Sequence, residues 1–263
     1  MVSVGSKPTG RTNDMSIVMN NHYEKFTYPS DHVSPADYVT SYITTPFRMT
    51  KTLLDKVDSV LVVGCGWAEA TQIAHHFKDT RVVGVDTSTR QISTAQRLKR
   101  ELRLDNLELI CDDAMNLGFN REFDSIIATG VLHHVKNVRP LLSRLHSYGK
   151  KNCILSGMVY SSNRRFIDRE AQVFRTMNLS NTDFKDISYV ASVLEHHADP
   201  RVRSFYETHL QTPNEIVDTW MHYYARTYSK ASLIRLMMKH DFYPVYCGKF
   251  DDPYKLLFSF VGG

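Results

Sequence analysis

The feature that most constrains this chain is a short apolar run ending in a glycine turn, Val60-Leu61-Val62-Val63-Gly64-Cys65-Gly66. Continuous apolar residues bounded by glycine are typical of a buried strand in a parallel sheet. Glycines directly after such a strand let the backbone approach a ligand closely. A helix predicted over 67–77 would add exposed N–H groups at its start. The turn therefore predicts a ligand site at the end of the first strand of an α/β domain.

Strand and helix patterns alternate after this turn, and further strands are expected at 81–86, 107–111, 123–128 and 153–159. Such alternation indicates βαβ units that cross over right-handedly into a parallel sheet. Beyond a helix at 229–240, two apolar runs at 243–247 and 254–261 are joined by a short, hairpin-like connection. The expected fold is therefore α/β, Rossmann-like and doubly wound, with a mostly parallel seven-stranded sheet and an antiparallel last strand.

The alternation is interrupted once, by a long segment with helical periodicity and no convincing strand. We expect a flexible N-terminus and a single following domain with two added segments that roof the site. The predicted boundaries are 1–15 for the flexible N-terminus, 16–57 for an N-terminal cap, 58–161 for the ligand-binding core, 162–227 for a helical insert and 228–263 for the last helix and strand hairpin.

Two observations narrow the ligand of the core. The dinucleotide pattern G-x-G-x-x-G would place its third small residue at Glu69, which argues against a nicotinamide or flavin dinucleotide. Asp86 ends the second strand, about 20 residues beyond the glycines, the spacing at which a carboxylate accepts ribose hydroxyl groups. An exposed strand-end Asp or a helix cap is the alternative, and the preceding glycine turn favours the ligand role.

Two more polar groups follow strands three and four. Asp112 and Asp113 could accept from an adenine amino group, or could serve ordinary turn chemistry. Thr129-Gly130 and the nearby His133-His134 come directly after the fourth strand. Because ligands of open α/β sheets bind at the carboxyl ends of the strands, we expect all these residues to outline one crevice.

The segment from Val60 to Val135 resembles the class I S-adenosylmethionine-dependent methyltransferases, especially their type 11/12 branches. The matching pieces are V-L-V-V-G-C-G-W-A, V-V-G-V-D-T-S, C-D-D-A-M-N-L and F-D-S-I-I-A-T-G-V-L-H-H-V. The resemblance implies that the glycine turn and the tip of strand four contact the methionine part of the cofactor, that Asp86 holds the ribose and that Asp113 with Ala114 reads the adenine. The implied S-adenosylmethionine site comprises Gly64, Cys65, Gly66, Asp86, Thr87, Asp112, Asp113, Ala114, Thr129 and Gly130.

Methyl transfer from a sulfonium requires alignment above all, and a base only if the acceptor must lose a proton. The catalytic candidates are His134, His222 and Tyr28. Each has a structural alternative, because the two histidines could simply pack and Tyr28 could be a packing aromatic. Arg164 and Arg165 follow strand five and could pair with an acidic acceptor, although a solvated pair is the default interpretation.

Other sequence features argue against nucleic-acid, membrane and metal partners. The net charge of +4, from 32 basic and 28 acidic residues, lacks the concentrated basic stripe of a nucleic-acid binder. No window is apolar enough to span a membrane, and the spaced cysteines are typical of a reduced, cytoplasmic protein. Adjacent histidines on a helix point about 100° apart, so no metal site is predicted.

These observations predict a cytoplasmic methyltransferase that uses S-adenosylmethionine and acts on a small-molecule acceptor. A cofactor-binding regulatory module, a tRNA or protein methyltransferase and a nicotinamide oxidoreductase remain as alternatives. The acceptor, the atom that is methylated and the oligomeric state are left open.

Overall fold

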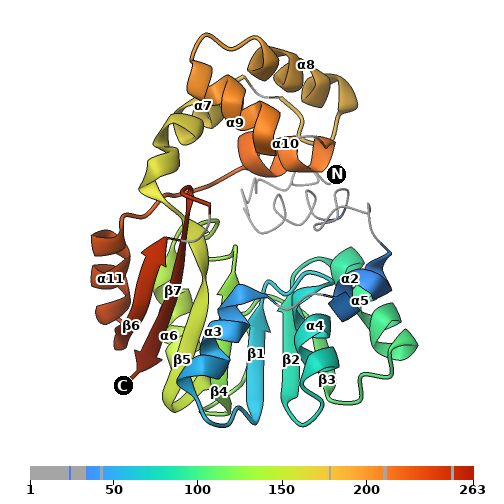
Figure 1. The fold of residues 1–263 in the computed structure, drawn as a ribbon, viewed down its shortest axis with the longest axis vertical. Coiled ribbons are helices and arrows are strands. Elements are labelled where there is room, and N and C mark those ends of the chain that lie inside the picture. Colours follow the sequence, from blue (N-terminus) through green and yellow to red (C-terminus); the bar gives the residue numbers. More distant parts are fainter. Residues whose placement is uncertain (1–23, 25–33, 42–43, 178, 210–211, 250–251) are drawn as a thin grey trace, which may run out of the picture.

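Strand β1 (Ser59–Val63) is buried along its whole length and supplies both faces of the sheet. Leu61 and Val63 enter one apolar cluster, while Val60 and Val62 enter another on the opposite face. Side chains of a strand alternate between faces, so this apolar run predicts helices on both sides of β1. The computed structural model, which describes residues 24, 34–41, 44–177, 179–209, 212–249 and 252–263, has this arrangement (Figure 1).

The described residues form one seven-stranded sheet, with the order β3-β2-β1-β4-β5-β7-β6. The other strands are β2 (Arg81–Asp86), β3 (Leu107–Cys111), β4 (Phe123–Thr129), β5 (Gly149–Tyr160), β6 (Phe242–Lys249) and β7 (Lys255–Gly262). β1 to β5 pair in parallel, and β7 runs antiparallel to both β5 and β6. The predicted fold class is therefore confirmed.

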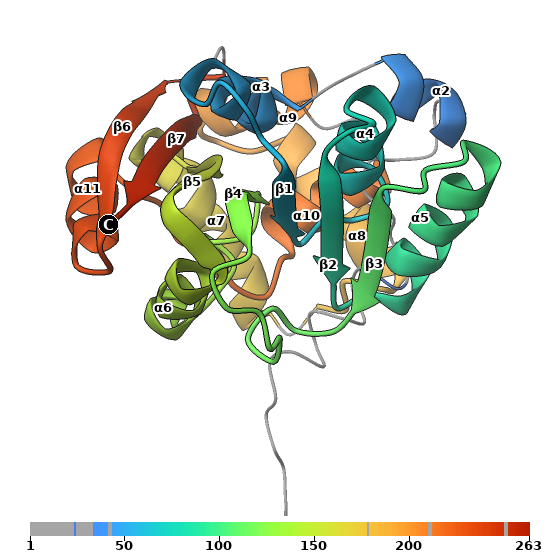
Figure 2. The ribbon, with the colours of Figure 1, turned by 90° about the horizontal axis from the view of Figure 1, so that it is seen from below.

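Helices cover both faces of the sheet (Figure 2). One face carries α6 (Val138–Tyr148) and α11 (Lys230–Met238), which share a core with Leu61 and Val63. The other carries α3 (Thr45–Leu53), α4 (Glu69–His76) and α5 (Thr89–Glu101). The short helix α2 (Pro35–Ser41) packs on α4, and the ring centre of its Tyr38 lies 5.5 Å from that of Trp67, just before α4.

The position of α3 differs from the expected N-terminal cap. Its residues Phe47 and Thr50 are fully buried, and the Thr50 Oγ1 lies 3.0 Å from the Ser156 Oγ of β5. This apolar and hydroxyl-bearing side holds α3 against the sheet face, so the helix does not roof the ends of the strands. The predictions made for residues 1–15 and for Tyr28 lie outside the described residues.

A separate group of helices stands above the carboxyl end of β5 (Figure 1). It consists of η1 (Ser162–Arg164), α7 (Arg165–Thr176), α8 (Phe184–Glu195), α9 (Pro200–His209) and α10 (Pro213–Trp220), here called the cap. The cap has its own apolar core, which includes Ile167, Val190 and the fully buried Trp220. Within the described residues, every helix is too short or too polar to cross a membrane.

The segment that leads from β5 into the cap and the segment that returns from the cap lie side by side. Tyr228 N–H donates to the Tyr160 carbonyl at 2.9 Å, and Ser162 N–H donates to the Tyr228 carbonyl at 2.8 Å. Arg226 N–H donates to the His133 carbonyl at 2.9 Å. These bonds fix the segment that follows α10 beside the segment that follows β4, so residues distant in sequence meet above the end of the sheet.

Candidate active site

The glycine turn after β1 has the backbone conformation that its sequence predicts. Gly64 and Gly66 both have positive φ angles, 61° and 52°, which disfavour residues with a side chain. A Cβ on Gly64 would come within 2.5 Å of the Val131 Cγ2, so the turn also packs closely against the segment after β4. Cys65 points inward, with its side chain 3% exposed, and only its backbone can face a ligand.

Asp86 bridges the ends of β1 and β2. Its Oδ2 accepts the Gly66 N–H at 2.9 Å, and its Oδ1 accepts the Ser88 N–H at 2.9 Å. Burial raises the pKa of this carboxyl, and the N–H groups of Ser88 and Gly66 oppose the shift. Each carboxylate oxygen has two lone pairs, so these bonds leave acceptor capacity for the hydroxyls of a ribose. Thr87, beside it, is exposed.

The β3 tip lies next to the β2 tip, because Asp86 is in register with Cys111. Asp113 is half-buried, and its Oδ1 accepts the Met115 N–H at 2.8 Å. Asp112 is exposed and accepts from the Asn116 amide at 2.8 Å, which is turn chemistry. The two tips thus come together as expected, with Asp113 the more enclosed of the two carboxylates.

The β4 tip is open on one side and bonded on the other. Gly130 has a φ of 77°, and a Cβ built on it would meet no described atom within 4 Å. Thr129 Oγ1 donates to the Glu69 Oε1 at 2.7 Å. Since β1 and β4 are parallel neighbours, with Val62 opposite Ile127, this tip stands directly beside the glycine turn.

Glu69 lies at the same tip, although its place in the sequence served only as evidence against a dinucleotide. It begins α4, is 8% exposed, and burial raises its pKa to about 7 against the opposing bond from Thr129. A buried carboxyl without a basic partner is costly to ionise. A cationic ligand at this tip would relieve that cost.

A second polar group lies where the cap meets the sheet. The rings of His134 and His222 stack with centroids 3.7 Å apart. His134 Nδ1 lies 2.9 Å from the Tyr224 carbonyl oxygen, while the Tyr224 N–H donates to His222 Nδ1 at 3.3 Å. A carbonyl can only accept and an N–H can only donate. The proton of neutral His134 is therefore on Nδ1 and that of neutral His222 on Nε2, so the ring lone pair of neutral His134 is on Nε2.

Asp218 completes this group, although it was not among the predicted site residues. One ligand-capable atom each from His134, Asp218 and His222 lies within 4.8 Å of the others. Tyr160, on β5, donates its hydroxyl to the Asp218 Oδ2 at 3.3 Å. The signal available in the sequence was the spacing of Asp218 and His222, four positions apart at the end of a helix.

This group fits proton transfer better than metal binding. The planes of the two stacked imidazoles are 29° apart, so their lone pairs lie in separate, nearly parallel planes and converge poorly on one ion. A metal-bound histidine also donates its other ring N–H, whereas His222 Nδ1 accepts one from Tyr224. The absence of a metal stays a prediction.

His133 differs from its neighbour. It is 1% exposed, its ring lies 3.8 Å from that of Tyr160, and neither ring nitrogen has a hydrogen-bond partner in the described part of the chain. Burial holds its pKa well below the usual range. His133 is therefore a neutral packing residue behind His134.

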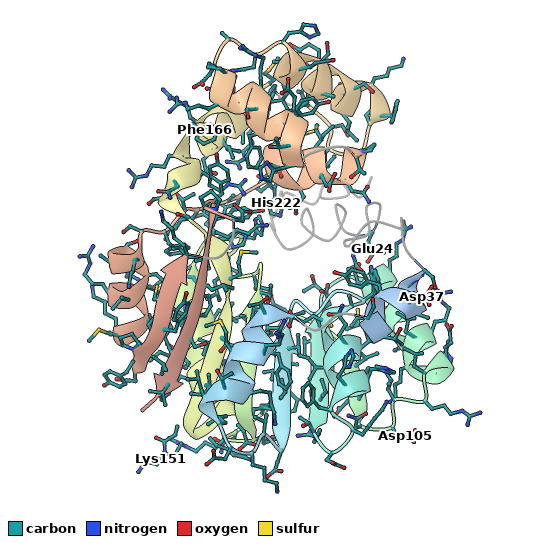
Figure 3. The ribbon with its side chains drawn as sticks, viewed as in Figure 1. Glu24, Asp37, Asp105, Lys151, Phe166 and His222 are labelled. Atoms are coloured by element: carbon teal, nitrogen blue, oxygen red, sulfur yellow. The ribbon has the colours of Figure 1, made fainter. Side chains whose placement is uncertain are left out.

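Glu24 reaches the same edge from the N-terminal side. Ser88 donates its hydroxyl to Glu24 Oε1 at 3.0 Å, and Arg90 Nη1 donates to the Glu24 carbonyl at 3.0 Å. Figure 3 shows Glu24 near α2 and α5 and His222 beneath the cap. The two residues thus belong to opposite sides of the candidate site, the β2 side and the β5 side.

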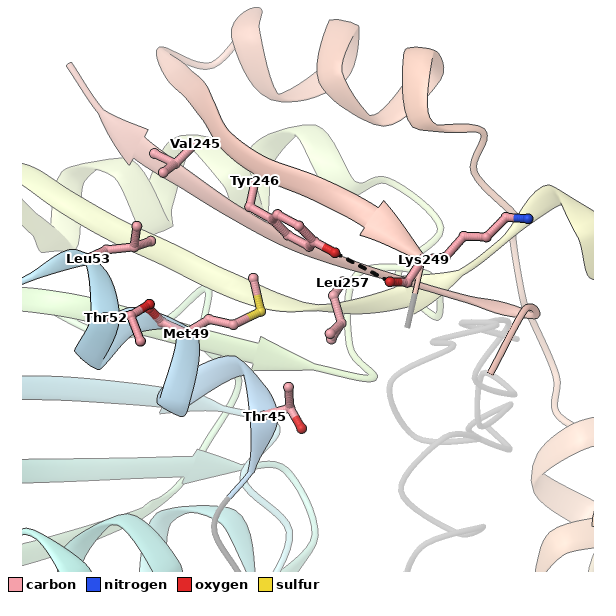
Figure 4. Close-up of a pocket in the computed structure, with 8 residues that line it drawn as sticks. All are labelled: Thr45, Met49, Thr52, Leu53, Val245, Tyr246, Lys249 and Leu257. Carbon is pink, nitrogen blue, oxygen red and sulfur yellow. Dashed lines mark hydrogen bonds between the residues drawn. The ribbon is translucent and has the colours of Figure 1, made fainter. Parts of the chain in front are cut away.

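A surface hollow of about 480 Å³ lies elsewhere, between α3 and the outer strands (Figure 4). Its lining residues are Thr45, Met49, Thr52, Leu53, Val245, Tyr246, Lys249 and Leu257. None of these eight belongs to the predicted site, so the hollow is separate from it.

The chain resembles known methyltransferases in sequence and in fold. The family described as "Methyltransferase domain" matches residues 61–155. (S)-Coclaurine N-methyltransferase of Papaver somniferum is 32% identical over 98 residues, covering 37% of this chain and 28% of the relative. A probable fatty acid methyltransferase of Pseudomonas putida is 33% identical over 86 residues, covering 32% and 22%. The matches thus span about a quarter of the length of these curated relatives.

A solved structure extends the likeness of the fold to nearly the whole chain. The Burkholderia thailandensis 1,6-didemethyltoxoflavin-N1-methyltransferase, solved with S-adenosylhomocysteine, covers 98% of this chain and 93% of its own, with a TM-score of 0.57 and 12% identity. Together with the sequence matches and the glycine turn, this fold identifies residues 61–155 as a class I methyltransferase domain, of the class that uses S-adenosylmethionine.

Proposed function

We propose that this chain transfers the methyl group of S-adenosylmethionine to a small-molecule acceptor. The observation that carries the proposal is the meeting of four strand tips at one sheet edge. They supply the glycine turn, the carboxylates of Asp86 and Asp113, and the unobstructed Gly130. Ribose, adenine and the methionine portion each need a different one of these groups.

Asp86 would accept the ribose hydroxyls while keeping its bonds to Gly66 and Ser88. Asp113 would accept the adenine amino group. Glu69 would face the ammonium of the methionine portion, a cation that compensates its buried charge. When bound, the cofactor supplies a methyl group already activated by a positive sulfur, so the remaining task of the protein is alignment.

His134 is the proposed base for an acceptor that carries a proton on its attacking oxygen or nitrogen. Its Nε2 would take that proton as the bond from the acceptor atom to the methyl carbon forms and the sulfur–carbon bond breaks. S-adenosylhomocysteine and the methylated acceptor are the products. Asp218 lies close enough to compensate the resulting imidazolium.

The relatives support a small-molecule acceptor. Their names specify an (S)-coclaurine N-methyltransferase, a probable fatty acid methyltransferase and a 1,6-didemethyltoxoflavin-N1-methyltransferase. They do not agree on one substrate, so the acceptor must be found by experiment.

The test has two stages. Calorimetric titration of the full chain with S-adenosylhomocysteine should give saturable one-site binding that NADH does not reproduce. Incubation with S-adenosylmethionine and a small-molecule library should then release S-adenosylhomocysteine with some acceptors. Cofactor binding without turnover on any acceptor would instead support the regulatory-module alternative, and no binding would refute the proposal.

A further inference from the structure

The side of η1 and α7 that faces the candidate site carries two arginines and one aspartate. Arg164, Asp168 and Arg175 are spaced by four and seven positions, which places them on one side of a helix. Arg164 is 3% exposed, so the default interpretation of a solvated pair is wrong for this residue. Arg165, its neighbour, is exposed and fits that interpretation.

This cluster carries an excess positive charge. Arg164 Nε lies 3.5 Å from the Asp168 Oδ1, the one ion pair that the described residues form within the cluster. Burial raises the pKa of Asp168, and the guanidinium groups of Arg164 and Arg175 both oppose that shift. One carboxylate therefore faces two guanidinium groups, which leaves one positive charge without a counter-ion inside the cluster.

Hydrogen-bond donors are left over as well. The Nη2 atoms of Arg164 and Arg175 are buried, and neither has a hydrogen-bond acceptor among the described residues. Buried polar groups are almost always hydrogen-bonded, and an unpaired buried charge is costly. A fold that buries two such donors is arranged for an acceptor that the described residues do not supply.

Both arginines adjoin the His134–His222 stack. The guanidinium carbon of Arg164 lies 3.5 Å from the centre of the Tyr160 ring, which is 5.4 Å from that of His134. Arg175 Nε donates to the His222 carbonyl at 2.7 Å. A group bound by the two guanidiniums would therefore lie one side chain away from the proposed base.

We infer that Arg164 and Arg175 bind a carboxylate of the methyl acceptor, an inference that rests on the proposed function. A monoanion matches the single uncompensated charge, whereas a phosphate would bring a second negative charge beside Asp168. Guanidinium groups match the planar, bidentate geometry of a carboxylate. A carboxylate held in this way has its lone pairs engaged and is a poor nucleophile. The methyl group therefore goes to another atom of the acceptor.

The test compares carboxylic acids with their amides, which have nearly the same shape. Formate, benzoate and octanoate are titrated against formamide, benzamide and octanamide, using the full chain saturated with S-adenosylhomocysteine. Because the three acids differ in size, an effect of the charge on binding can be told apart from an effect of the ligand's shape. At least one acid should bind at least about tenfold more tightly than its amide, as expected for charged hydrogen bonds.

Two variants test whether the preference for the acid over the amide depends on the buried arginine. Arg164→Met removes the buried guanidinium and should abolish the preference for the acid, while Arg165→Met removes an exposed one and should keep it. Acids that bind no better than amides to the wild type would overturn the inference, as would equal losses in both variants. Binding of S-adenosylhomocysteine is measured in the same preparations. If the wild type does not bind it, the proposed function is refuted instead of this inference.

Discussion

The imidazole rings of His134 and His222 stack with centroids 3.7 Å apart, and the backbone of Tyr224 bonds to both. One peptide residue thus sets the tautomer of two histidines, by accepting from one and donating to the other. The contact joins the segment after β4 to the segment after α10, so the cap and the sheet edge share one chemical group.

This relationship predicts opposite tautomers for the two rings. Neutral His134 should carry its proton on Nδ1 and neutral His222 on Nε2. Long-range proton–nitrogen NMR spectra of ¹⁵N-histidine-labelled protein distinguish the two forms, with His134→Gln and His222→Gln providing the assignments. Finding the Nε2–H form for both rings would contradict the proposed orientation of the base.

Replacing Asp86 tests the ribose site. Asp86→Ala should weaken S-adenosylhomocysteine binding by about 1–3 kcal/mol, because a charged hydrogen-bond acceptor is lost. Asp105→Ala, an exposed change near the start of β3 at the opposite edge of the sheet, is the matched control and should bind normally. Calorimetry showing the same affinity for both variants would remove Asp86 from the site.

Glu69 should make the protein less stable as pH rises. Burial raises its pKa from 4.5 to about 7, so the unfolded chain releases a proton that the native state retains. The free energy of unfolding relative to Glu69→Gln should therefore fall between pH 4.5 and 7, by on the order of 2–3 kcal/mol, and level off above 7.

Urea unfolding at several pH values measures this difference. The exposed Glu101→Gln serves as the control and should parallel the wild type. Parallel curves for the wild type and Glu69→Gln would mean that Glu69 ionises in the folded protein at its ordinary pKa.

Gly64 in the glycine turn and Gly118 outside it offer a matched pair of glycine substitutions. Gly64→Ala places a Cβ within 2.5 Å of Val131 at a φ of 61°, and should destabilise the fold by about 1–3 kcal/mol. A Cβ on Gly118 meets no described atom within 4 Å, so Gly118→Ala should change stability little. Thermal unfolding measures both, and equal melting temperatures would show that the turn tolerates side chains.

Local patterns in the sequence predict the sheet well, because each depends on neighbouring residues. The run of β1, its glycine turn and the position of Asp86 follow from residues within a few positions of one another. The predicted 81–86 and 107–111 strands have the same bounds in the structure. The antiparallel last strand follows from a short connection.

The contacts that build the acceptor side are long-range and leave little local signal. Nothing near Arg164 in the sequence shows that it would be buried over Tyr160, and Asp218 meets His134 only through the fold of the cap. The position of α3 differs from the expected N-terminal cap for a similar reason. Its Thr50 contacts Ser156, a residue of the sheet that is distant in the sequence.

The most direct test of the account is a crystal structure of the full chain with S-adenosylhomocysteine. We expect the ribose hydroxyls within hydrogen-bond distance of Asp86, the adenine amino group beside Asp113, and the sulfur on the side of Gly130 that faces His134. A ligand bound away from this edge, or a ribose that contacts neither oxygen of Asp86, would contradict the account.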